Sequence, residues 1–66
     1  MPFVEIKLAE GRDPKTLRAC LAAVHNAVRD SLGVEDQAVR VHITEFKPEL
    51  WSAGGVTMAE RRAQSL

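Results

Sequence analysis

The sequence lacks the features that mark several large classes of protein. It has one cysteine and three aromatic residues in 66 positions. A lone cysteine cannot build an internal disulfide framework, and the two histidines lack the paired spacing of a zinc site. No apolar stretch approaches the roughly 20 residues that span a bilayer. Nine basic and nine acidic residues cancel, so the chain has no net basic field to attract nucleic acid or an anionic membrane.

The start of the chain also lacks the pattern of an export signal. Met1-Pro2-Phe3-Val4-Glu5 contains no basic region followed by an apolar block. We therefore expect a soluble, cytoplasmic protein whose partners include neither nucleic acid nor membrane.

The size of the chain predicts one domain, residues 1–66, with a marginal core. A domain of about 60 residues buries only about 60% of the surface that its unfolded chain exposes. Disulfides are excluded and no metal cluster is indicated, so oligomerisation is the remaining route to stability.

Hydrophobic periodicity predicts two strands with a helix between them. Pro2–Leu8 and Val39–Phe46 alternate apolar with polar residues, as half-buried strands do. An Asp-Pro pair and Gly33 mark the two ends of a helix over about 14–32. The apolar stripe of this helix consists of Leu17, Leu21, Val24, Val28 and Leu32.

Strand, helix and strand form a β-α-β unit, so the predicted fold class is α+β with two parallel strands and a right-handed crossover. Residues 47–50 are expected to form a loop, and Ser52–Gly55 a tight hairpin. Thr57-Met58-Ala59-Glu60 has the form of a capping box, which predicts a short helix at the carboxyl end.

This unit leaves one sheet face and both sheet edges open. The open face carries Phe3 and Phe46 beside Arg40 and His42. We expect two subunits to pair edge to edge and three such dimers to close into a homohexamer. A hetero-oligomer is left open.

A few residues have the chemistry of a site. If Met1 is removed, Pro2 becomes a secondary amine, and apolar surroundings near arginines would lower the pKa of its protonated form. Arg12 and Arg40 present guanidinium forks that suit carboxylates, and Trp51 offers an apolar wall. Each residue also has an ordinary explanation. Met-Pro is a common start of a chain, the two arginines can form surface ion pairs, and Trp51 can fill a subunit interface.

Together these positions resemble the 4-oxalocrotonate tautomerase family. The resemblance runs without a gap from Pro2 to Gly55 and implies a β-α-β subunit, an oligomer and a catalytic amino-terminal proline without a cofactor. The motifs that carry it are Pro2, Glu10-Gly11-Arg12, Val39-Arg40-Val41-His42-Ile43-Thr44-Glu45 and Trp51-Ser52-Ala53-Gly54-Gly55.

The resemblance implies a role for each matching residue. Pro2 falls on the general base that moves a proton in an enol or keto acid of the 2-hydroxymuconate type. Arg40 falls on the arginine that grips one carboxylate and polarises the adjacent carbonyl, and Arg12 on the arginine that holds the far carboxylate. Trp51 replaces a phenylalanine that keeps the pocket apolar, which changes the pocket volume. In the family, the arginines and the aromatic residue reach a given proline from neighbouring subunits.

Two departures leave alternatives open. Ala53 stands where hydratase relatives have a glutamate that activates water, which argues against a hydratase. A retained Met1 would convert the Pro2 nitrogen into an amide without a basic lone pair. The alternatives are a promiscuous phenylenolpyruvate-type tautomerase and a non-catalytic subunit or small-ligand binding module.

The other residues with reactive or charged groups are expected to be structural. Cys20 lies on the flank of the apolar helix stripe and is expected to fill the core. His25 is expected at the surface, and Arg61 with Arg62 in solvent or at an interface. His42 remains a weaker site candidate, since it shares a face with Arg40.

Overall fold

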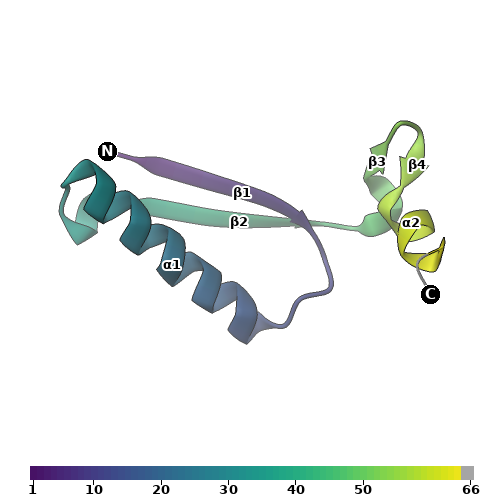
Figure 1. Ribbon diagram of the computed structural model, residues 1–66, viewed down its shortest axis with the longest axis horizontal. Helices are drawn as coiled ribbons and strands as arrows, with labels where there is room; N and C mark the ends of the chain where they lie inside the picture. Colours follow the sequence, from purple (N-terminus) through teal and green to yellow (C-terminus); the bar gives the residue numbers. More distant parts are fainter. Residues whose placement is uncertain (65–66) are drawn as a thin grey trace.

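The computed structural model describes residues 1–64 and consists of a β-α-β unit with a C-terminal arm, residues 48–64 (Figure 1). The unit comprises β1 (Phe3–Ala9), α1 (Pro14–Leu32) and β2 (Arg40–Phe46). The arm carries β3 (Ser52–Ala53), β4 (Val56–Thr57) and α2 (Met58–Gln64). Short 3₁₀ turns at Asp36–Ala38 and Pro48–Leu50 lead into and out of β2. The second of these turns lies in the predicted 47–50 loop.

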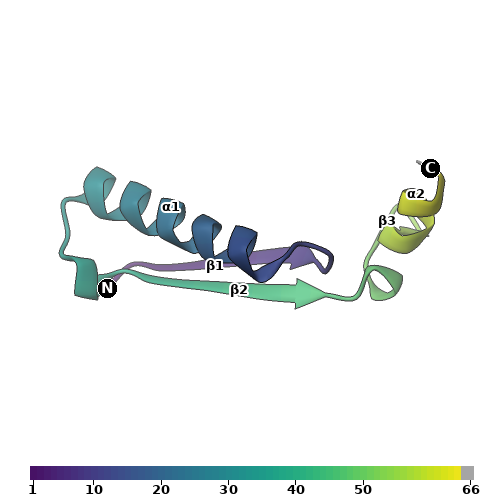
Figure 2. The ribbon, with the colours of Figure 1, turned by 90° about the horizontal axis from the view of Figure 1, so that it is seen from below.

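The strands β1 and β2 pair in parallel, with Phe3 opposite Arg40 and Ala9 opposite Phe46. Figure 2 shows α1 covering one face of this two-stranded sheet. The residues of β1 alternate in burial, with Val4, Ile6 and Leu8 half-buried and Phe3, Glu5 and Lys7 exposed. The predicted faces and the parallel pairing are therefore confirmed, with the strand bounds shifted by one residue.

Both ends of α1 are set by local hydrogen bonds. The Asp13 carboxylate accepts a hydrogen bond from the Thr16 amide over 2.7 Å, and this bond lowers the pKa of Asp13. Gly33 ends the helix with φ 65° and donates its amide to the Arg29 carbonyl over 2.9 Å. A residue with a β-carbon would be strained at that φ, so glycine suits the position.

One member of the predicted apolar stripe is not covered. Leu32 is 61% exposed, whereas the other four residues of the stripe are half-buried. The prediction for Leu32 is wrong because the last turn of α1 runs past the first residues of both strands, so no sheet lies beneath it (Figures 1 and 2).

The chain on its own has almost no core. Among residues 1–64, only Ala9 and Val39 are buried. The radius of gyration is 15.1 Å, against about 11 Å for a compact chain of this length. The accessible surface is 4977 Å², against about 4,200 Å² for a compact monomer of this mass. Such an extended, thinly covered chain is expected to associate.

The C-terminal arm forms the predicted hairpin and short helix. Gly54 and Gly55 have φ of 62° and 81°, which suits a two-residue turn between β3 and β4. The Thr57 hydroxyl accepts a hydrogen bond from the Glu60 amide and donates one to the Glu60 carboxylate, both over 3.1 Å. No helix within residues 1–64 is long and apolar enough to cross a membrane.

Candidate active site

The first two candidate residues lie at one end of the sheet. Pro2 is half-buried and directly precedes β1, and its carbonyl oxygen accepts a hydrogen bond from the Arg40 amide over 3.0 Å. The amino terminus thus lies near the point where β2 begins (Figure 1). The backbone hydrogen bond therefore holds Pro2 beside Arg40 independently of the conformations of their side chains.

The Arg40 side chain lies on the open face of the sheet, the face that α1 leaves uncovered. Its strand neighbour in register is Phe3, which is 64% exposed. The guanidinium donates a hydrogen bond to the Gln37 carbonyl in the turn before β2. Because the side chain remains exposed, the guanidinium can exchange this carbonyl for a carboxylate.

Arg12 lies in the loop between β1 and α1, beyond the other end of the sheet. Its guanidinium donates to the Ala9 carbonyl over 3.3 Å. The same loop contacts the C-terminal arm, since Arg62 donates to the Glu10 carbonyl over 2.8 Å. A β-carbon on Gly11, whose φ is 135°, would lie 3.3 Å from the Arg62 guanidinium. The loop therefore favours glycine next to Arg12 because of this positive φ, since the flexible Arg62 side chain can move away from a β-carbon.

Trp51 follows the turn after β2 and packs edge-on against Phe46. The two ring centroids are 5.7 Å apart and the ring planes meet at 80°, a favourable aromatic arrangement. The two rings border an open hollow of about 440 Å³. Its lining residues are Lys7, Phe46, Leu50, Trp51 and Ser52.

The four candidate residues therefore form two pairs at opposite ends of the sheet. Pro2 and Arg40 lie where β2 begins, whereas Arg12 and Trp51 follow the ends of β1 and β2. A strand of seven residues separates the pairs by roughly 20 Å. One chain cannot bring all four against a small molecule, so a site built from them requires at least two copies.

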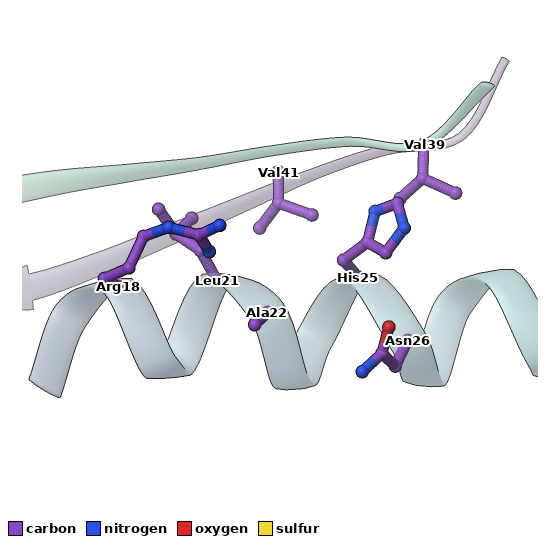
Figure 3. A pocket seen from close by; sticks show the side chains of 7 residues that line it. All are labelled: Arg18, Leu21, Ala22, His25, Asn26, Val39 and Val41. Carbon is purple, nitrogen blue, oxygen red and sulfur yellow. The ribbon is translucent and has the colours of Figure 1, made fainter. Parts of the chain in front are cut away.

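A second hollow, of about 430 Å³, runs between α1 and the edge of β2 that does not face β1 (Figure 3). Arg18 and His25 extend from the helix over Val39 and Val41 of the β2 segment. The other lining residues are Leu21, Ala22 and Asn26. None of the four candidate residues lines this second hollow.

The structure also shows an ion-pair cluster that sequence reasoning missed. The Asp36 carboxylate lies 2.9 Å from both His25 Nε2 and the Arg29 guanidinium, and Arg29 also pairs with Asp30. These contacts lower the pKa of Asp36, mainly through His25 and then through Arg29. The cluster ties the turn before β2 to α1. The signal available in the sequence was the spacing of four residues between His25 and Arg29, which places both side chains on one face of a helix. This spacing did not identify Asp36 as their partner.

The weaker candidate His42 lies two residues from Arg40 on the same strand. Cys20 is half-buried, and His42 is exposed on the open face beside Thr44. Within residues 1–64, no group of three or more His, Cys, Asp or Glu side chains is placed to hold a metal ion.

Comparison with known proteins finds relatives over nearly the whole chain. The family model described as tautomerase enzyme matches residues 2–61. A probable tautomerase of Staphylococcus aureus is 36% identical over 61 residues, which are 92% of this chain and 100% of that protein.

The solved structures that share the β-α-β fold include two that match nearly the whole chain. TomN, a 4-oxalocrotonate tautomerase homologue in the tomaymycin biosynthetic pathway, is 40% identical with a TM-score of 0.91, over 98% of this chain and 100% of that chain. A heterohexamer 4-oxalocrotonate tautomerase from Chloroflexus aurantiacus is 32% identical with a TM-score of 0.86, over 91% and 97%.

Proposed function

Because this chain belongs to the tautomerase family, we propose that it is a cofactor-independent isomerase acting on an enol or keto acid of the 2-hydroxymuconate type. The Pro2 nitrogen, freed by removal of Met1, takes a proton from the hydroxyl group of the enol, or from the carbon next to the carbonyl of the keto acid. It then returns the proton to another carbon of the conjugated chain. The proton leaves and re-enters the same molecule, so the step consumes no second substrate. The observation that carries the proposal is the backbone hydrogen bond of 3.0 Å that holds Pro2 beside Arg40 of the same chain. Pro2 therefore lies beside an Arg40 of its own chain, whereas the family resemblance expects the arginine from a neighbouring subunit.

Arg40 has the chemistry to stabilise the intermediate of this reaction. Loss of the proton leaves negative charge on the enolate oxygen and the adjacent carboxylate. An exposed guanidinium at the same end of the sheet as Pro2 can donate two parallel hydrogen bonds to these oxygens. Arg40 therefore acts mainly on charge that grows in the transition state.

Arg12 and Trp51 serve the remote end of the substrate. Arg12 holds the far carboxylate of a diacid, and Trp51 with Phe46 forms the apolar wall that excludes water from the reacting carbons. Since these residues lie roughly 20 Å from Pro2 of the same chain, the site combines Pro2 of one subunit with Trp51 of a neighbour.

The assembly that provides these neighbours is a hexamer, a trimer of dimers of this chain in the cytoplasm. Support comes from the scarcity of buried residues in the single chain and from the heterohexamer among the related structures. Three closed dimers cover the open sheet faces without leaving a filament end.

An intact-mass measurement combined with an ultraviolet assay tests the proposal. The mass must correspond to a chain that begins at Pro2, and the protein must isomerise 2-hydroxymuconate. A panel that includes phenylenolpyruvate tests a second substrate class, which the aromatic wall of Phe46 and Trp51 favours. Retention of Met1 with no turnover of any enol acid would instead favour a non-catalytic binding module.

A further inference from the structure

Lys7 lies in the hollow beside Trp51 but belongs to none of the motifs that point to the site. It is the fifth residue of β1 and lies on the open face, opposite Thr44 in the register. Of the five lining residues of the hollow, Lys7 carries the one charged side chain, and Phe46, Leu50 and Trp51 are apolar or aromatic. The hollow therefore combines an apolar wall with an ammonium group.

The ammonium of Lys7 is available to a ligand. It pairs with the Glu5 carboxylate over 3.4 Å, and the two side chains are 61% and 41% exposed. Ion pairs this exposed are weak, because water screens the charges and holding both side chains in place costs entropy. A ligand carboxylate can replace Glu5 without disturbing the strand.

The size and lining of the hollow suit one chemical class of ligand. Small-molecule sites commonly measure about 300–1,000 Å³ and combine apolar walls with a few polar groups, and this hollow measures about 440 Å³. A planar conjugated chain fits against aromatic rings, and an anionic end group complements the ammonium. Arg12 lies beyond the same end of the sheet but does not line the hollow.

We propose that Lys7 is a specificity-determining residue that binds the remote carboxylate of a dianionic conjugated acid, while the body of that acid lies on Trp51 and Phe46. The assignment rests on the proposed function, since it places the substrate in the hollow that Trp51 lines. Lys7 thus adds a second positive charge for the carboxylate assigned to Arg12, and its effect is on binding rather than on proton transfer.

Steady-state kinetics of Lys7→Gln provide the first test. We expect KM for 2-hydroxymuconate to rise about tenfold while kcat stays within about twofold, since uniform binding is lost and the reacting end is unchanged. KM for phenylenolpyruvate, which lacks a remote carboxylate, should not change. Lys7→Arg should restore KM, and Lys15→Gln, an exposed lysine at the start of α1, is the matched control.

Binding can be measured without catalysis because Trp51 is the sole tryptophan of the chain. The Pro2→Ala protein is titrated with trans,trans-muconate, a conjugated dicarboxylate without a hydroxyl group, and indole fluorescence is followed. We expect saturable quenching whose Kd rises about tenfold when Lys7→Gln is added. Sorbate, the corresponding monocarboxylate diene, should bind equally to both proteins.

The outcomes separate this inference from the proposed function. Full activity of Pro2→Ala would reject the proposed function. Loss of activity in Pro2→Ala, together with an unchanged KM and Kd for the diacids in Lys7→Gln, would reject the role of Lys7 alone. Dissociation of the assembly in Lys7→Gln would also reject the binding role of Lys7, because it would identify Lys7 as an interface residue. An equal loss of kcat on both substrates would reject the binding role in the same way.

Discussion

The amide of Arg40 donates a hydrogen bond to the carbonyl oxygen of Pro2 over 3.0 Å. This bond continues the parallel pairing of β1 and β2 by one residue beyond Phe3. It positions the residue proposed as the base through backbone contacts alone. Substitution of either side chain therefore tests its chemistry with little disturbance of the geometry of the other.

Replacement of Pro2 is expected to impair the base. Pro2→Ala exchanges the secondary amine, held by the pyrrolidine ring, for a mobile primary amine. It should lower kcat about 100-fold, within the range of about 10²–10⁴-fold that general base catalysis contributes. In the parent protein, activity should rise with pH as the Pro2 nitrogen loses its proton. This rising part of the pH–rate profile should change in the variant. Stopped-flow or steady-state ultraviolet assays measure both effects. Pro14→Ala, at the first position of α1, is the control, and light scattering should show an intact oligomer in both variants.

Replacement of Arg40 is expected to act on the transition state. Arg40→Ala should lower kcat by about 10²–10³-fold with a smaller change in KM, as for loss of one preorganised donor to a developing oxyanion. Arg40→Lys keeps the charge but loses the two-pronged geometry, so it should restore only part of the rate. A rise in KM at unchanged kcat would contradict this role.

Replacement of Arg12 is expected to act on substrate binding. Arg12→Ala should raise KM for diacids several-fold and leave kcat nearly unchanged, because the remote carboxylate takes no part in the reaction. Monoacids should be affected much less. Equal effects on the two substrate classes, measured in the same assay, would remove the far-carboxylate role.

The working unit is expected to be a hexamer. Because Pro2 and Trp51 of one chain lie at opposite ends of the sheet, dissociation should abolish activity together with stability. Light scattering and sedimentation equilibrium over a dilution series, with activity measured on the same samples, provide the test. A fully active monomer at micromolar concentration would contradict both the assembly and the shared site.

Stability in acid is expected to depend on Asp36. Contacts with His25 and Arg29 lower the pKa of Asp36 below its ordinary value of 3.8. A carboxylate with a lowered pKa in the folded state stabilises the fold above the unfolded pKa, and this contribution disappears as the pH falls through the folded pKa. Asp36→Asn should therefore lower Tm modestly near pH 7, and the difference from the parent should vanish in strong acid.

Thermal unfolding at neutral pH and at successively lower pH measures this dependence. Glu35→Gln is the matched control, since it removes a neighbouring exposed carboxylate that lies outside the cluster. A constant difference in Tm between Asp36→Asn and the parent across this range would mean that Asp36 acts through packing or turn geometry rather than through its charge.

The sequence alone determined most of the local structure. Alternation set which side chains of β1 face α1, and an Asp-Pro pair with Gly33 set the ends of the helix. Gly54-Gly55 predicted the hairpin turn and Thr57 with Glu60 predicted the start of α2. These features depend on residues near each other in the chain, so periodicity, φ preferences and capping hydrogen bonds suffice to predict them.

Only the tertiary structure decided which distant residues meet. It left Leu32 uncovered, paired Asp36 with His25 and Arg29, and brought Lys7 to the same hollow as Trp51. It also separated Pro2 from Trp51 by the length of a strand. Residue spacing along the chain does not give these relationships, because they depend on the lengths of the elements and on where each turn returns the chain to the sheet.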